Sequence, residues 1–241
     1  MPPRPYGFAP GPRFCYDVGV FFRRTPERSA REQRWGALAE RLELVDASDR
    51  AERIRRWLDL EAVVVRPLYA LRREGLPTVY LFDAVSERHG PSGSVRSFRS
   101  HCLVRSETVI ARYAFRALPR QDKVMESLHA SRSGAVRVSL PSDAAFESAV
   151  SVYARVAEGP AALLTAPVRR VLQRLLAERG AKDASLVVGE RHVVSSFVSG
   201  DEESLSLLEQ VLADTLSLVS LLPAVQRTNE ELDADDLLDI G

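Results

Sequence analysis

The clearest indication of the fold of this chain is residues 182–222, with the sequence KDASLVVGERHVVSSFVSGDEESLSLLEQVLADTLSLVSLL. Two apolar runs, 186–188 and 192–194, flank the short turn 189–191, and this spacing predicts a β-hairpin. Asp201 is expected to cap the N-terminus of a long helix that ends at Leu222. A hairpin followed at once by an amphipathic helix is typical of an α+β layer rather than of alternating parallel units.

The predicted helix 201–222 is apolar on two sides. The first stripe consists of Leu205, Leu208, Leu212, Leu216 and Val219. The second stripe consists of Leu207, Val211, Leu218 and Leu221. One stripe can cover a sheet, so another subdomain or another subunit should cover the second, and a homo-oligomer through this helix is one expectation.

Upstream of the hairpin, the pattern predicts the order ββαββα over residues 134–222. Val136 and Val138 alternate with polar residues, and residues 146–156 read as a long strand. Pro167 opens a helix that runs to Arg179, and Gly180 suits the position just after a helix.

The first half of the chain predicts two helices and several strands. One helix begins at Thr25, and a second covers 49–58 after a cap at Ser48 or Asp49. The apolar stripe of the first helix is Trp35, Leu38, Ala39 and Leu42, and the inward residues of the second are Ile54, Trp57 and Leu58. Strands are expected at 63–65, 78–82, 95–104 and 109–117, and a short helix at 120–130.

The predicted fold is therefore α+β, with a mainly antiparallel sheet and helices packed on one face as a two-layer sandwich. The predicted organisation leaves a division into two subdomains open. Its parts are an extended Pro/Arg-rich arm (1–24), a first α+β region (25–132), a second α+β region (133–222) and an acidic disordered tail (223–241).

Composition favours an ordinary globular protein of the bacterial cytoplasm. The 33 basic and 33 acidic residues balance, which argues against a dedicated polyanion binder. Two distant cysteines, Cys15 and Cys102, give no disulfide framework. The N-terminus lacks the apolar core of a signal peptide, and Glu209 and Asp214 interrupt the longest apolar stretch, so no membrane span is expected.

No catalytic, cofactor or metal motif emerges from the sequence. The adjacent His101 and Cys102 should point to opposite sides of a strand, which prevents them from sharing a zinc ion. Cys102 is expected to be a small buried hydrophobe. Asp83 is the one acid in a suggestive place, although an acid there more often ends a strand. The sequence thus predicts a protein that is not an enzyme and uses no cofactor.

Two interaction surfaces remain as functional hypotheses. The main one is the segment after Pro223, which carries six acids and one Arg with aliphatic residues among them. Large aliphatics lower the solubility of an exposed tail, so their presence favours a docking peptide and an adaptor function. The predicted partner-binding residues are Leu232, Asp233, Asp235, Asp236, Leu237, Leu238, Asp239 and Ile240.

The alternative function is association with nucleic acid through the Arg-rich helices near residues 23–56. Acidic residues are interleaved with these arginines, and a mixed-charge helix surface is the ordinary interpretation. Binding of nucleic acid is therefore the less favoured hypothesis.

Several of these features resemble an uncharacterised bacterial family, a domain of unknown function whose members often carry membrane helices before an α+β region. The resemblance spans residues 35–222 and is carried by structural motifs. These are the WxxLAxxL helix (Trp35, Leu38, Ala39, Leu42), the strand 79–83, the strand near Phe146, the helix 167–179, the hairpin 185–197 and the final helix. The resemblance implies the α+β fold and transfers no catalytic residue, and the acidic tail is a departure from the family.

Overall fold

The computed structural model describes residues 30–58, 60, 63–74, 77–90, 93–120, 134–199 and 204–222. Four sequence predictions lie outside these residues in whole or nearly so: the arm 1–24, the cap at Thr25, the helix 120–130 and the tail 223–241. The predicted cap at Asp201 lies outside them as well.

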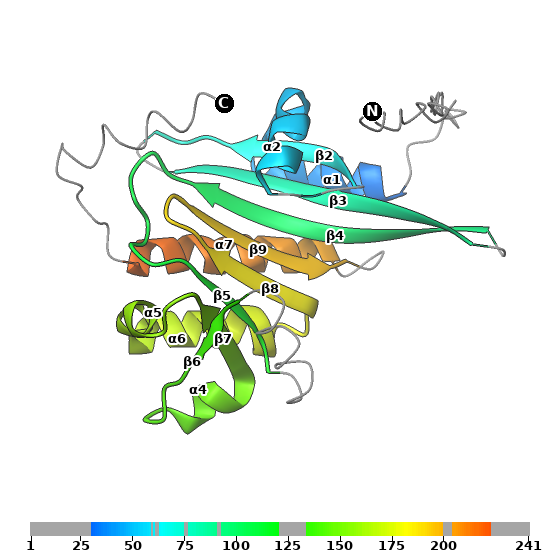
Figure 1. The fold of residues 1–241 in the computed structure, drawn as a ribbon. Coiled ribbons are helices and arrows are strands. Elements are labelled where there is room, and N and C mark those ends of the chain that lie inside the picture. The colour runs from blue at the N-terminus through cyan, green and yellow to red at the C-terminus, as the bar shows by residue number, and fades with distance from the viewer. Residues whose placement is uncertain are drawn as a thin grey trace, which may run out of the picture.

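The described residues form one antiparallel sheet of nine strands, in the order β1-β2-β3-β4-β9-β8-β5-β7-β6 (Figure 1). The strands are β1 (Val45–Asp46), β2 (Val64–Leu71), β3 (Thr78–Gly90), β4 (Gly93–Arg105), β5 (Phe115–Pro119), β6 (Val136–Val138), β7 (Val150–Ala154), β8 (Lys182–Val188) and β9 (His192–Val198). β5 pairs with β7 and β8, so strands from both halves of the chain belong to one sheet.

The helices are short except for the last. They are α1 (Ala30–Arg41), the 3-10 turn η1 (Ser48–Arg50), α2 (Ala51–Trp57), α4 (Ala144–Ala149), α5 (Glu158–Leu163), α6 (Ala166–Gln173) with its π-helical extension η2 (Arg174–Glu178), and α7 (Ser204–Leu221). Gly180 follows η2 with a φ of 67°, which confirms the prediction that a glycine ends this helix.

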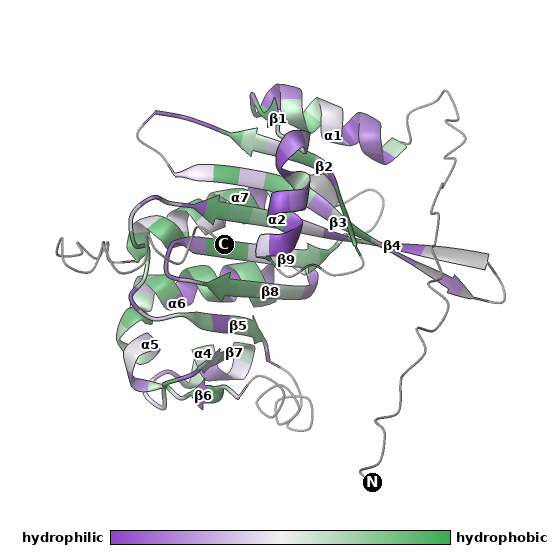
Figure 2. Ribbon diagram, turned by 45° about the horizontal axis from the view of Figure 1, so that its top comes forward, coloured by the Kyte–Doolittle hydropathy of each residue, from purple (hydrophilic) through white to green (hydrophobic). Residues whose placement is uncertain are grey.

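The two faces of the sheet carry different helices. One face, called here the helix face, packs against α1, α6 and α7 and holds the main core. The other face carries α2 and is called the α2 face; a smaller apolar cluster there joins Ile54 to Phe82 and Leu103. Figure 2 shows α2 crossing in front of the strands, with α6 and α7 behind them. The α+β antiparallel fold with one main helical layer is thus confirmed, and α2 is an addition on the opposite face.

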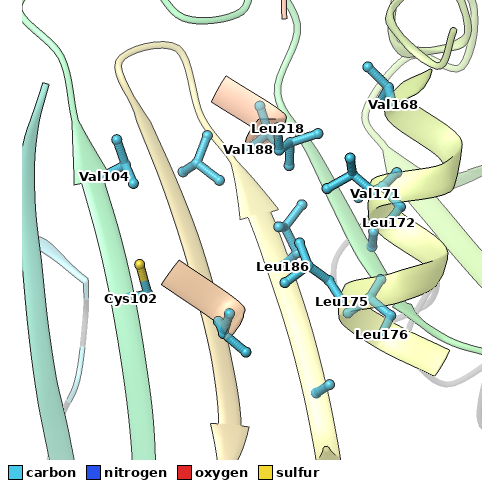
Figure 3. Packing of buried hydrophobic residues seen from close by; sticks show 14 of the residues in the cluster. Cys102, Val104, Val168, Val171, Leu172, Leu175, Leu176, Leu186, Val188 and Leu218 are labelled. Carbon is cyan, nitrogen blue, oxygen red and sulfur yellow. The ribbon is translucent and has the colours of Figure 1, made fainter. Parts of the chain in front are cut away.

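The main core lies between the sheet and the pair α6 and α7. Figure 3 shows Val171 and Leu175 of the α6–η2 helix directed toward Leu186 and Val188 of β8, with Leu218 of α7 closing one end. All five side chains are buried. This packing explains why the helix 166–178 has its apolar residues on one side.

The two predicted stripes of α7 are largely parts of one wide buried face. Val211 and Leu218 of the second stripe are buried together with Leu208 and Leu212 of the first. Leu221 remains 37% exposed within this chain, so its expected coverage by protein stays a prediction. The sheet and α6 of the same chain cover most of the face, and an oligomer through this helix stays a prediction.

The strand predicted over 146–156 is wrong over its first four residues, 146–149, which belong to α4. Asp143 accepts a hydrogen bond of 3.0 Å from the backbone amide of Phe146 and so caps α4, and β7 begins only at Val150. The strand predicted over 109–117 is shifted to 115–119. The amides of Ile110 and Ala111 bond to the carbonyl of Glu190 instead of joining a ladder.

Candidate ligand site on the sheet

His101 and Cys102, which the sequence analysis considered as metal ligands, are neighbours on β4. His101 and Cys102 do point to opposite faces of β4. Cys102 is fully buried on the helix face, and burial raises the pKa of its thiol to about 12. A thiol that stays protonated at neutral pH is a poor nucleophile, so Cys102 is a core residue as predicted.

Asp83 does not end a strand but lies within β3 with no exposed surface. Its carboxylate accepts hydrogen bonds from Arg31 Nε at 2.8 Å, Trp35 Nε1 at 2.7 Å and Ser100 Oγ at 2.7 Å. The guanidinium of Arg31 also lies 4.5 Å from the centre of the Phe98 ring. These contacts fasten α1 to the sheet, so Asp83 has a structural role that its place in the sequence did not reveal.

The predicted partner-binding residues 232–240 lie outside the described residues, and their role stays a prediction. Within the described part of the chain, no three His, Cys, Asp or Glu side chains gather as metal ligands would.

A hollow of about 870 Å³ on the α2 face brings arginines, serine hydroxyls and histidines together. It lies beside α2, where β4, β9, β8 and β5 are left uncovered by the described helices. Apolar walls come from Leu58, Leu60, Leu118, Val187 and Val194. We call this feature the sheet hollow.

The polar floor of the sheet hollow is a row of side chains across three strands. His101 of β4 is the register partner of Ser196 on β9, and Ser196 is the partner of Ser185 on β8. The two serine hydroxyls hydrogen-bond to each other at 2.8 Å. Alternation along each strand places the whole row on the α2 face.

Two arginines converge on this row from opposite sides. Arg99 of β4 donates from Nη1 to the carbonyl of Asp183 at 2.9 Å and to Ser196 Oγ at 3.3 Å. Arg116 comes from β5, three strands away, and lines the same hollow. Burial lowers the pKa of Arg99, the Asp183 carboxylate raises it, and the charge of Arg116 lowers it by a smaller amount. The Arg99 guanidinium therefore lies within electrostatic reach of both Asp183 and Arg116.

The imidazole of His101 is the third unusual group at this floor. It is 4% exposed and stacks on Phe82 with ring centres 4.8 Å apart. Neither ring nitrogen has a hydrogen-bond partner among the described residues. Burial, with a smaller effect from Arg99, lowers the pKa of His101 to about 3, so the ring is neutral at pH 7. A buried polar group without a partner costs about 1–3 kcal/mol, which a bound group could recover.

Helices α1 and α2 use several of their arginines within the chain. Arg31 pairs with Asp83, and Arg41 Nη2 lies 2.6 Å from Glu209 Oε1. Arg55 contacts Glu52 at 2.7 Å. These pairs favour the mixed-charge interpretation over a basic face made by the two helices. The arginines at positions 23, 24 and 28 fall outside the described residues.

Sequence reasoning did not find the sheet hollow. In the sequence, each of Arg99, Arg116 and His101 looks like an ordinary solvent-facing residue of a strand with alternating polarity. One signal was present, because these residues lie within the predicted strands 95–104 and 109–117 and not at their ends, which implies a polar surface on the sheet. Nothing in the sequence shows that β9 and β8 separate β4 from β5.

Comparison with known proteins gives a likeness of fold. No family model matches the chain, and no curated protein matches it. Among solved structures, the mycobacterial trehalose monomycolate transport factor A, TtfA, superposes with a TM-score of 0.56 over 83% of this chain and all of that chain, at 8% sequence identity. The resemblance to the uncharacterised bacterial family is therefore neither confirmed nor contradicted. No helix in the described part of the chain is long and apolar enough to cross a membrane.

Proposed function

We propose that this chain is a non-enzymatic binding protein whose sheet hollow takes an amphipathic anion. The observation that carries the proposal is the convergence of Arg99 and Arg116 on a floor that also holds the unpartnered imidazole of His101. A carboxylate, sulfate or phosphate beside the two guanidinium groups would accept charge-assisted hydrogen bonds from them, in competition with the Asp183 carboxylate that already acts on Arg99.

The walls of the hollow define the rest of the ligand. Leu58, Leu60 and Leu118 border it together with the strand residues Val187 and Val194. Burial of an aliphatic or aromatic body against these side chains contributes about 25 cal/mol for each Å² removed from water. A hollow with apolar walls and a few convergent polar groups is the usual form of a small-molecule site.

The geometry favours binding over catalysis. The hydroxyls of Ser185 and Ser196 bond to each other, and His101 makes no hydrogen bond to either of them. Activation of a serine as nucleophile needs a base within hydrogen-bond reach. The mycobacterial neighbour TtfA is by name a transport factor, which is in keeping with a binding role, although the likeness to it extends to the fold alone.

Calorimetry with the full chain tests this proposal. Decyl phosphate below its micelle concentration should bind, whereas decyltrimethylammonium, with the same apolar body and the opposite charge, should not. Arg99→Gln and Arg116→Gln should each weaken binding about tenfold or more, because a charged hydrogen bond contributes about 1.5–3 kcal/mol. Arg73→Gln, an exposed arginine outside the hollow, is the matched control. Equal affinity for both amphiphiles, or equal affinity of all variants, would refute the proposal.

The cytoplasmic adaptor function predicted from residues 232–240 stays a proposal beside this one. Leu237→Ala with Leu238→Ala should remove a protein partner in a pull-down, because the aliphatics supply the buried area. Conversion of Asp233, Asp235, Asp236 and Asp239 to Asn should mainly slow association and reduce its salt dependence. Retention of the same partners by both variants would leave the segment as a solubility device.

Association with nucleic acid is the third and least favoured function. The ion pairs of Arg31, Arg41 and Arg55 with acids of the same chain make these three arginines less available for phosphate contacts. Any affinity should then fall with salt on a shallow slope of roughly −0.9 for each phosphate contacted on duplex DNA. A tight, sequence-selective complex at physiological salt would reverse this ranking.

A further inference from the structure

We propose that the acidic segment 223–241 docks on its own chain, along a line of arginines that leads from the end of α7 to α2. The line consists of Arg105, Arg191, Arg50 and Arg53 and is called here the arginine track. It lies on the other side of Trp57 from the Arg99–Arg116 pair. The arginine track is thus a second surface, and docking there does not depend on a ligand in the sheet hollow.

Three adjoining hollows make the track continuous. The first, of about 510 Å³, is bordered by Leu222, the last described residue, and also by Thr78 and Arg105. The second shares Thr78 and Arg105 with the first and adds Arg50 and Arg191. The third, of about 310 Å³, shares Arg50, Arg105 and Arg191 with the second and adds Arg53. Leu222, the point from which residues 223–241 continue, therefore borders the start of the track.

The floor of the track is fixed by the ends of the central strands. The amide of Ser106 donates to the carbonyl of Arg191 at 3.0 Å, and the amide of Ile110 donates to the carbonyl of Glu190 at 2.7 Å. Arg50 Nη1 donates to Tyr80 Oη at 3.1 Å, and the Arg105 guanidinium lies 5.6 Å from the centre of the Trp57 ring. The side chains of Arg50 and Arg105 are therefore held in place before any ligand arrives, and the backbone of Arg191 is fixed beside them.

Charge complementarity selects the occupant. The linings of the second and third hollows contain four arginines against two acids, Glu107 and Glu190. Residues 223–241 contain six acids against one basic residue, Arg227. Opposite charges in a partly enclosed groove attract more strongly than across open water.

Apolar groups match as well. Trp57 borders the third hollow and is 42% exposed, whereas Ile54 and Leu103 in its lining are buried. The first hollow offers Val109 and Val219. The acidic segment carries large aliphatic residues between its acids, namely Leu232, Leu237, Leu238 and Ile240. The exposed indole of Trp57 beside the arginines of the track suits a peptide that carries aliphatic residues among its acids.

The segment is long enough to make this contact. From Leu222 to Gly241 there are 19 residues, which span about 60 Å when extended. The path leads from the helix face around the ends of β3 and β4 to α2, across layers each about 10 Å thick. The segment 223–241 and the arginine track belong to one chain, so the effective concentration of the segment at the track is high. Even a weak affinity would therefore give high occupancy of the track.

Photo-cross-linking in the full chain tests the proposal. With p-benzoylphenylalanine at Leu237, illumination should give intramolecular cross-links to peptides that contain residues 50–58, 105–111 or 189–192. Arg53→Glu with Arg191→Glu should lower their yield about fivefold or more, since each reversal replaces an attraction with a repulsion. Arg155→Glu with Arg170→Glu makes the same change of charge at two exposed arginines that border none of the three hollows, and it should leave the yield unchanged.

Charge restoration separates docking from misfolding. Asp235→Arg with Asp236→Arg, added to the Arg53→Glu and Arg191→Glu chain, should recover most of the cross-links. Ionic strength near 1 M should also lower the wild-type yield, because it shortens the screening length to about 3 Å. Docking within one chain would be overturned if the cross-links were spread over unrelated surfaces or occurred only between two copies. It would also be overturned if the four substitutions left the cross-linking yield unchanged.

Discussion

The indole Nε1 of Trp35 donates a hydrogen bond of 2.7 Å to Oδ2 of Asp83, and neither residue has exposed surface. The same carboxylate oxygen accepts a hydrogen bond from Arg31 Nε at 2.8 Å. One buried acid thus holds two residues of α1 against β3. A buried charge is tolerated only when it is paired and hydrogen-bonded, so this site should be sensitive to substitution.

Asp83→Ala should lower the free energy of unfolding by about 3–5 kcal/mol, because it leaves Arg31 and the Trp35 indole without their acceptor. Urea denaturation measures this loss. The matched control is Asp49→Ala, whose side chain is 79% exposed and lies 3.9 Å from Arg50 Nε. That substitution should change stability by about 0.5 kcal/mol or less. Similar effects of the two substitutions would contradict the structural role of Asp83.

Acidification should destabilise the fold through His101. Burial holds the pKa of His101 at about 3, whereas an unfolded chain has a histidine pKa of about 6.5. As the pH falls below about 6.5, the unfolded state binds a proton that the native state does not. The unfolding free energy then drops by up to about 1.4 kcal/mol per pH unit until the pH approaches 3.

Urea denaturation of the wild type and His101→Phe between about pH 7 and pH 5 measures this linkage. The phenylalanine can keep the stack on Phe82 and cannot titrate. The variant should lose the His101 part of the slope. Burial also lowers the pKa of His192, so a smaller slope of the same sign should remain. Parallel curves for the two proteins would show that His101 is not held neutral.

Two leucines on α7 form a matched pair for the packing of this helix. Leu218 has no exposed surface, and Leu221 is 37% exposed. Leu218→Ala should cost about 2–5 kcal/mol, because it removes buried methyl groups and leaves a cavity. Leu221→Ala should cost about 1 kcal/mol or less. Thermal unfolding of both variants distinguishes this arrangement from one in which the second stripe faces another subunit.

Substitution by alanine at two glycines, Gly36 and Gly180, should change the free energy of unfolding in opposite directions. Gly36 lies within α1, and an added Cβ there would meet no atom within 4 Å. Gly36→Ala should stabilise the fold by about 0.5–1 kcal/mol through helix propensity and the entropy of the unfolded chain. Gly180 has a φ of 67°, so Gly180→Ala should cost about 1–2 kcal/mol. Chemical denaturation of the pair gives the sign of each change.

The hairpin β8–β9 and the helix α6 were predictable from sequence because their signals are local. The turn 189–191 and Gly180 each define an element end within a few residues. The error at residues 146–149 has a local cause too. A helix of one and a half turns has too few residues to show its period, and only the side chain of Asp143 marks its start.

The inward position predicted for Trp57 was wrong for a different reason. A period of 3.6 residues places Trp57 on the same side of α2 as Ile54, and Ile54 is indeed buried. Trp57 lies in the last turn, where it meets the His192 ring edge-on at 4.6 Å between ring centres and stays 42% exposed. Periodicity gives the side of a helix and not the extent of the sheet beneath it.

Local patterns in the sequence were enough to predict which segments are apolar, where most strands and helices lie, and that the chain belongs to the α+β class. The insertion of β9 and β8 between β4 and β5 became visible only once the strands were seen paired in the sheet. That strand order brings Arg99, His101 and Arg116 to the sheet hollow. It also brings the ends of β3, β4 and β9 to the arginine track. The physical reason is that alternation along a strand fixes the face of each side chain, whereas neighbours across a sheet are fixed by strand order and register, which depend on long-range pairing.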